Sequence, residues 1–204
     1  MGMYMFKQKR LCGFLLIGLT ATSTQADIFR VDASAPDGGD GTTWAAAFNV
    51  LQDAFDAARD NGDSIDEIWL RGGTYLPTYR MDEDPSFGED GDNPRAVVLV
   101  PRGNVEVYGG FGGWEIQRDE RDIVANPTII SGDLEGNDLP NWQNRQDNAY
   151  VLFLLNFEGP GTCDNDDPQD LAVVGPIVLD GITIRGGYND TNDSTCWRNG
   201  NGVA

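Results

Sequence analysis

Apolar and polar residues alternate in several short stretches of the chain, which is the pattern of β-strands with one buried face. The clearest stretch spans residues 105–114 and ends in a glycine-rich corner, Gly-Gly-Phe-Gly-Gly-Trp. Related phrases, each a short apolar run followed by glycine, recur at 67–73, 128–133 and 181–187. Further strands are predicted in these segments: 27–32, 95–100, 150–155 and 177–179.

One segment departs from this alternation and has the period of a helix. We predict a helix over residues 49–60, capped by Asn49 with Gln52 as the capping-box partner. Gly62 suits its C-terminal end. Its apolar residues recur at the spacing i, i+3, i+4 and i+7 of a single helical face: Leu51, Ala54, Phe55 and Ala58.

The spacing of the strands predicts the architecture. Centres near Val107, Ile130, Phe153 and Ile182 are 23, 23 and 29 residues apart, which is the range of one turn of a solenoid. Short strands stacked turn on turn bury a continuous core. We therefore predict an all-β fold, a right-handed parallel β-helix with the helix as its N-terminal cap. A β-sandwich is the alternative, because it also consists of short strands and turns.

The ends of the chain suggest a division into three parts. Residues 1–26 have a basic start and a short apolar run, the pattern of a cleaved secretory signal; an uncleaved anchor is the alternative. Residues 27–66 form the first strand, loop and capping helix, and residues 67–204 form the β-helix turns. Because no cap is apparent at the C-terminal end, we interpret the chain as a fragment. Its open end then meets downstream turns or a stacking partner.

The charge balance excludes some classes of partner. The chain has 14 basic and 33 acidic residues and no His, for a net charge of −19. Both lysines lie in the signal segment, so every later basic residue is Arg. Such a chain repels nucleic acid and anionic lipid. With the signal segment, this composition predicts a secreted or cell-surface protein.

Several phrases occur in order along the chain: VDA at 31–33, DGTTWAAAF at 40–48, LQDA at 51–54, EIWLRGGTY at 67–75, YGGFGG at 108–113, NPTIISGD at 126–133 and LDGITI at 179–184. Together they resemble the N-terminal module of exported bacterial right-handed parallel β-helix repeat proteins of the pectin-lyase-like superfamily. The resemblance implies the same fold and export. It does not imply an activity, because one fold hosts many functions.

Candidate catalytic residues are few. The polygalacturonases of the superfamily that the chain resembles carry a His-containing motif and an Arg-x-Lys motif, but this chain has no His and no Lys after Lys9. Uronate β-elimination instead needs a cation and a base. Arg71 and Arg185 are weak candidates for that base, since each is more readily explained as a surface residue and Arg stays protonated.

Binding residues are suggested by three acidic loops, two tryptophans and two cysteines. The acidic loops are candidate Ca²⁺ sites or plain solvated loops. Trp142 and Trp197, in polar loops, are candidates for stacking on sugar rings, or pack beneath their loops. Cys163 and Cys196 form either a disulfide or two free thiols. The Ca²⁺ candidates are Asp82, Asp84, Asp90, Asp92, Asp133, Asp138, Asp164, Asp166 and Asp167.

Two functions remain open. The first is a secreted or cell-surface β-helix scaffold, non-catalytic, for adhesion or carbohydrate binding, with polysaccharide or cell-surface components as partners. The second is a polysaccharide lyase of the pectate type that uses Ca²⁺ and an Arg base, with active turns partly beyond residue 204. The missing His and Lys favour the first.

Overall fold

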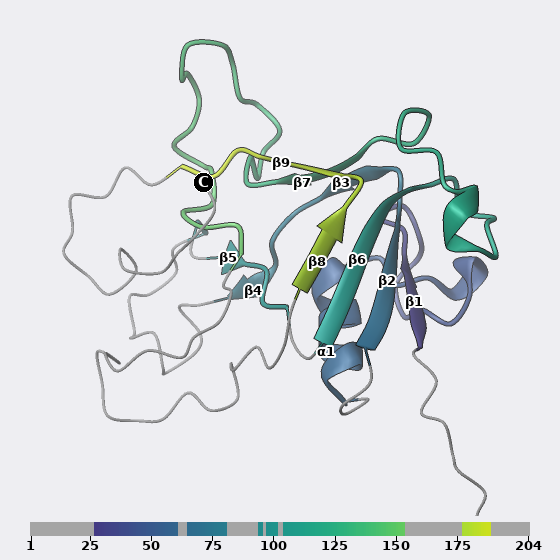
Figure 1. The fold of residues 1–204 in the computed structure, drawn as a ribbon. Helices are drawn as coiled ribbons and strands as arrows, with labels where there is room; N and C mark the ends of the chain where they lie inside the picture. Colours follow the sequence, from purple (N-terminus) through teal and green to yellow (C-terminus); the bar gives the residue numbers. More distant parts are fainter. Residues whose placement is uncertain are drawn as a thin grey trace, which may run out of the picture.

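The computed structural model describes residues 27–60, 65–80, 94–95, 97–101, 104–153 and 177–188. Figure 1 shows its elements as coloured ribbons. The helical elements are η1 (Trp44–Ala46), α1 (Leu51–Asp60) and η3 (Arg118–Glu120). The strands are β1 (Ile28–Val31), β2 (Ile65–Arg71), β3 (Gly73–Tyr75), β4 (Tyr79–Arg80), β5 (Val97–Val98), β6 (Asn104–Phe111), β7 (Thr128–Ser131), β8 (Ile177–Asp180) and β9 (Ile182–Arg185).

Two parallel sheets carry most of the strands. The first has the order β1-β2-β6-β8 and the second the order β3-β7-β9. In the first sheet Val107 of β6 pairs with Ile68 of β2 and Leu179 of β8. In the second, Ile130 of β7 pairs with Tyr75 and Ile184. β4 and β5 form a short antiparallel pair.

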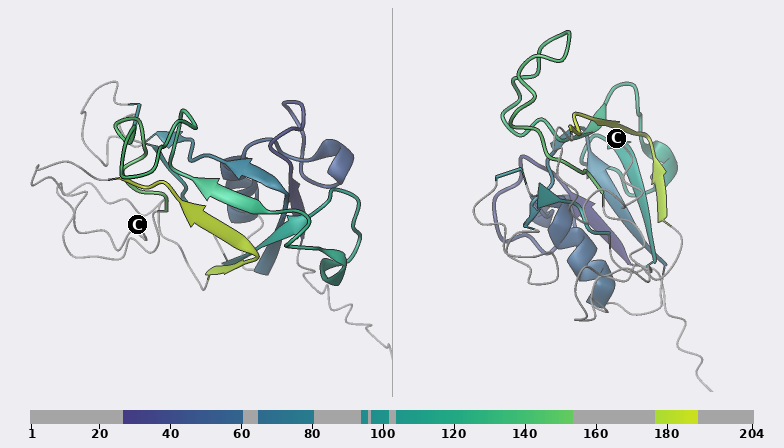
Figure 2. Two further views of the ribbon diagram at one scale, coloured as in Figure 1. Left: turned by 90° about the horizontal axis from the view of Figure 1, so that it is seen from above. Right: turned by 90° about the vertical axis from the view of Figure 1, so that its left-hand side faces the viewer.

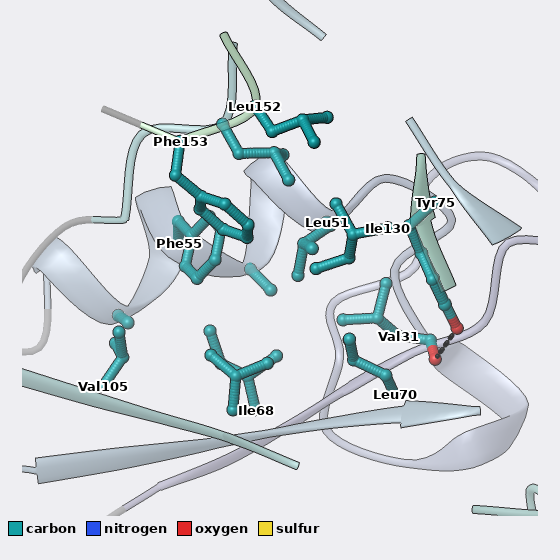
Figure 3. Close-up of a cluster of buried hydrophobic side chains, with 14 residues drawn as sticks. Val31, Leu51, Phe55, Ile68, Leu70, Tyr75, Val105, Ile130, Leu152 and Phe153 are labelled. Atoms are coloured by element: carbon teal, nitrogen blue, oxygen red, sulfur yellow. Dashed lines mark hydrogen bonds between the residues drawn. The ribbon is translucent and has the colours of Figure 1, made fainter. Parts of the chain in front are cut away.

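The main core is formed by side chains of the first sheet, the second sheet and α1. Figures 1 and 2 show the arrangement of these elements from three directions. Figure 3 shows Leu51 and Phe55 of α1 facing Ile68 of the first sheet, with Phe153 alongside. Alternation along β6 accounts for this arrangement, because every second residue points to the same face of the sheet. Val105 is fully buried in the core and is followed by the partly exposed Glu106.

A buried amide ties α1 to the segment after β5. Gln52 donates from Nε2 to the backbone oxygen of Val100 at 3.1 Å. The backbone N–H of Val100 in turn donates to Gln52 Oε1 at 2.9 Å. The two side chains expected to form a capping box make other contacts: Gln52 bonds Val100, and Asn49 donates its Nδ2 to Asp37 at 2.6 Å. The helix itself forms where the helical spacing predicts one.

The prediction of an all-β, right-handed parallel β-helix with a capping helix is wrong. The described residues have mixed α/β content: two parallel sheets, one antiparallel pair and one α-helix that is part of the core. The spacing of the predicted strand centres indicated the wrong architecture, because those centres belong to strands of different sheets. Val107 lies in the first sheet, whereas Ile130 and Ile182 lie in the second. Phe153 is in neither and forms only an isolated bridge with Leu99.

The corner between the sheets is tightly packed around glycine. A Cβ atom on Gly109 would lie 2.8 Å from Cβ of Thr128 and would also collide with the backbone oxygen of Gly181. The next residue, Gly110, has a φ of 98°, a conformation that suits glycine because it has no side chain. Its N–H donates to Oγ1 of Thr128 at 2.9 Å. This corner holds the end of β6 against the start of β7.

Candidate functional site

A long polar loop, residues 133–148, follows β7 and is called here the Trp142 loop. It projects away from the two sheets, in green at the top of Figure 1. Asp133 organises its start, because its two carboxylate oxygens accept the backbone N–H groups of Asn137 at 3.0 Å and Asp138 at 3.1 Å. Both oxygens of Asp133 are thus used to shape the loop.

Trp142 is 70% exposed. Three non-glycine residues of the loop, Trp142 included, have positive φ: Asn141 at 62°, Trp142 at 63° and Asn144 at 61°. Such conformations are uncommon outside glycine, and an observed cluster supports a hypothesis of function. The guanidinium carbon of Arg145 lies 4.4 Å from the centre of the Trp142 ring. The loop therefore presents an aromatic ring, backed by one cation, to solvent.

Asp138 lies at the base of the same loop and is held by one oxygen. Its Oδ2 accepts a hydrogen bond from Nδ2 of Asn148 at 3.1 Å and lies 3.8 Å from Nη2 of Arg145. Asn148 also donates from Nδ2 to the backbone oxygen of Gly186 at 2.6 Å. These contacts connect the loop to the end of β9.

Arg71 lies at the end of β2 and is paired with Asp32 of the loop after β1, Nη1 to Oδ2, at 2.6 Å. This hydrogen bond raises the pKa of Arg71 above its ordinary value, and the nearby negative charge of Asp32 adds to the shift. A base must lose its proton before it can accept one, so the pairing makes Arg71 a poorer base than a free arginine.

A surface groove of about 430 Å³ lies beside Arg71. Arg71 is the only charged residue among those that line it. Arg185, the other candidate base, is exposed at the end of β9 in the second sheet and lines no part of this groove. The lining residues are Arg71, Gly72, Gly73, Thr74, Phe111, Gly112, Ala125, Asn126, Pro127 and Ile129.

A third group of interacting side chains, a charged and aromatic cluster on the outer face of the first sheet, was not predicted from the sequence. Glu67 and Glu106 are paired on neighbouring strands, and Nη1 of Arg118 lies 3.1 Å and 3.6 Å from their carboxylates. Arg118 also donates to the hydroxyl of Tyr108 at 2.7 Å. Burial and a hydrogen bond to Glu106 raise the pKa of Tyr108 to about 12. The repeated phrase Glu-x-aromatic in both strands was the available signal.

Two arginine side chains cover the aromatic ring of this third cluster. The guanidinium carbons of Arg118 and Arg121 lie 4.5 Å and 5.0 Å from the ring centre of Tyr108. Arg121 is itself held by Asp180 of β8 at 2.9 Å. With Tyr108 itself buried, the cluster fastens the loop before β7 to the sheet and offers no exposed aromatic face.

The remaining candidate residues lie outside the described part of the chain, as do the predicted signal segment 1–26 and the C-terminal residues 189–204. Within the described part, no group of three or more His, Cys, Asp or Glu side chains lies close enough together to hold a metal. No helix there is long and apolar enough to cross a membrane. The undescribed candidates are Asp82, Asp84, Asp90, Asp92, Asp164, Asp166, Asp167, Trp197, Cys163 and Cys196.

Comparison with known proteins adds no assignment: no family model, curated protein or solved structure matches the chain. The resemblance of its phrases to exported repeat proteins stays a prediction.

Proposed function

We propose that this chain is a non-catalytic, exported carbohydrate-binding protein whose Trp142 loop stacks on a sugar ring. The observation that carries the proposal is the exposed indole of Trp142 in a loop with three positive-φ residues. An exposed large apolar side chain held at an energetic cost is a candidate contact for a ligand. The apolar face of a pyranose matches an indole, whose flat ring supplies a large contact area.

The loop also has the polar groups that a sugar needs. Exposed amide side chains flank the ring at Asn141, Gln143 and Asn144. An amide offers both donors and an acceptor, which suits hydroxyl groups. Aromatic contact with a few polar groups is the usual composition of a small-ligand site.

Charge narrows the class of sugar. The Trp142 loop holds four carboxylates against Arg145, in a chain of net charge −19. Negative potential repels a uronate and leaves a neutral sugar unaffected. We therefore infer a neutral polysaccharide rather than an acidic one. The raised pKa of Arg71 also makes this residue a poorer base, which favours a binding function over lyase chemistry.

The test is electrophoresis of the folded protein in native gels that contain galactomannan, hydroxyethylcellulose or polygalacturonate. A neutral polysaccharide should retard the wild type. Trp142→Ala should bind at least about tenfold more weakly, equivalent to about 1.4 kcal/mol.

Trp114→Ala is the matched control, because Trp114 is 68% exposed but lies in a different loop. It should be retarded like the wild type. The proposal is wrong if no neutral polysaccharide retards the wild type, or if Trp142→Ala and Trp114→Ala behave alike. Retardation by polygalacturonate alone would overturn the neutral-sugar inference.

A further inference from the structure

Buried polar atoms without partners are concentrated at the base of the Trp142 loop. Across the described residues, five buried side-chain nitrogen or oxygen atoms have no hydrogen-bond partner, and four of them belong to this loop. Native proteins leave few such atoms, and a group of them calls for water or an ion. The four are Asn137 Oδ1, Asp138 Oδ1, Arg145 Nε and Asn148 Oδ1.

Three of the four atoms are side-chain oxygens. They belong to residues that are linked by hydrogen bonds, either directly or through Asp133. Asn148 is fully buried, and its amide points at Asp138, where Nδ2 donates to Oδ2 at 3.1 Å. Asn137 and Asp138 are consecutive, and both backbone N–H groups are held by Asp133. The second oxygens of Asp138 and Asn148 are left without partners.

We propose that Asn137, Asp138 and Asn148 bind one Ca²⁺ ion through these three side-chain oxygens. Calcium takes six to eight oxygens, and amide and carboxylate oxygens both serve, with water completing the shell. The local charge supports a cation over a water molecule, because the loop carries four carboxylates and one arginine.

This assignment revises the calcium candidates. Asp133 is not one of the three proposed ligands, because neither of its oxygens is left without a partner: each accepts a backbone N–H group. Asp138 stays, and two asparagines join it. Arg145 approaches Asp138 at Oδ2, at 3.8 Å, and leaves Oδ1 without a partner. With one carboxylate ligand, the affinity should be at the weak end of protein calcium sites, with a Kd of about 1 mM.

Thermal unfolding with and without the ion tests the site. For a Kd of about 1 mM, about 10 mM Ca²⁺ should raise the Tm of the wild type by roughly 3–6 °C over its value in chelator. Mg²⁺ should raise it less, because Mg²⁺ is smaller and keeps its waters. An equal Tm in Ca²⁺ and in chelator would mean that water alone fills the site, and would overturn the proposal.

Two variants locate the effect. Asp138→Asn keeps an oxygen for Asn148 but removes the charged ligand, so the Ca²⁺-induced shift should be lost. Asn137→Ala removes one ligand at the partly exposed rim of the loop, and should weaken Ca²⁺ binding severalfold even if Asp138→Asn fails to fold. Asp119→Asn, exposed on η3, is the control and should keep the full shift. If Asp138→Asn or Asn137→Ala also keeps it, the ion binds elsewhere.

Terbium luminescence tests whether the bound ion lies close to Trp142. Tb³⁺ substitutes for Ca²⁺ and luminesces when a nearby tryptophan is excited. Trp142 is close to the site, since Arg145 contacts both its ring and Asp138. Trp142→Phe should therefore lose most of the Ca²⁺-displaceable emission and keep the Ca²⁺-induced shift in Tm. Unchanged emission in Trp142→Phe would place the ion away from this loop. None of these measurements depends on polysaccharide binding.

Discussion

At the scale of single residues, Glu115 shows how one buried carboxylate can hold a loop. Its side chain is 1% exposed. One oxygen accepts the N–H of Gly112 at 2.6 Å, and the other accepts those of Gly113 and Trp114 at 3.0 Å each. Burial alone would raise the pKa of Glu115, but the backbone hydrogen bonds outweigh it and lower the pKa below its ordinary value. The charged form is therefore the one that the fold selects.

Replacing Glu115 by Gln should lower stability in a pH-dependent way. Because the folded-state pKa is depressed, the carboxylate stabilises the fold above its unfolded-state pKa, and this contribution is lost as pH falls through the folded-state pKa. Glu115→Gln should lose roughly 1.5–3 kcal/mol at neutral pH. The difference from wild type should shrink in acid. Urea unfolding across pH measures it, with Asp119→Asn as the control; a constant difference at all pH values would contradict the assignment.

At the scale of elements, the junction of the two sheets depends on the absence of a side chain at Gly109. A Cβ there meets Thr128 and the backbone of Gly181, so β6, the start of β7 and the turn between β8 and β9 come together at this point. Backbone atoms cannot move aside cheaply, because the parallel pairing of β6 with β8 fixes them. Gly73, in β3, lacks this constraint: the nearest atom to its added Cβ is the Arg71 oxygen at 3.9 Å.

Two alanine substitutions should therefore differ in effect. Gly109→Ala should destabilise the protein by about 2–4 kcal/mol, through overpacking against backbone. Gly73→Ala should be neutral or slightly stabilising, because it only reduces the entropy of the unfolded chain. Chemical denaturation of both variants provides the measurement. Equal free energies of unfolding would show that the corner tolerates a side chain.

The elements also show what sequence patterns can and cannot predict. Alternation locates β6 and β7, because it depends on neighbours within one strand. It does not say that Val107 and Ile130 belong to different sheets, since pairing is decided by segments far apart in sequence. The spacing of Leu51 and Phe55 likewise predicts a helix, but not that this helix enters the core. Residue spacing within one strand or helix is a local property, whereas the pairing and packing of elements depend on residues far apart in the sequence.

Part of the candidate site could be predicted from the sequence, and part could not. Trp142 could be selected from sequence, because a large aromatic in a polar loop is conspicuous. Asn137 and Asn148 could not, since amides are common in such loops and their spacing matches no metal-binding pattern. Their significance depends on burial without partners, which only the folded arrangement reveals.

At the scale of the whole molecule, repulsion between carboxylates opposes compactness. The net charge is −19, and paired arginines offset only part of the local charge, as Arg71 does with Asp32 and Arg121 with Asp180. Partly exposed pairs of this kind are worth about 0–1 kcal/mol each. Self-repulsion from the large acidic excess should therefore outweigh what the pairs contribute.

Added salt should accordingly stabilise the protein. Screening by NaCl weakens both attraction and repulsion, but repulsion between the excess carboxylates is the stronger of the two here. Raising NaCl from low to about 0.5 M, with chelator present, should increase Tm by roughly 2–6 °C. Calorimetry provides the measurement, and potassium chloride serves as the control for an ion-specific effect. A fall in Tm would mean that the ion pairs dominate.

The pair of hydrogen bonds between Gln52 and Val100 has a consequence for hydrogen exchange. The amide proton of Val100 is covered by a side chain of α1 rather than by a neighbouring strand. It can exchange with solvent only when α1 moves away or residues 97–101 detach from it. The protection of the Val100 amide should therefore report on the attachment of α1 to this segment.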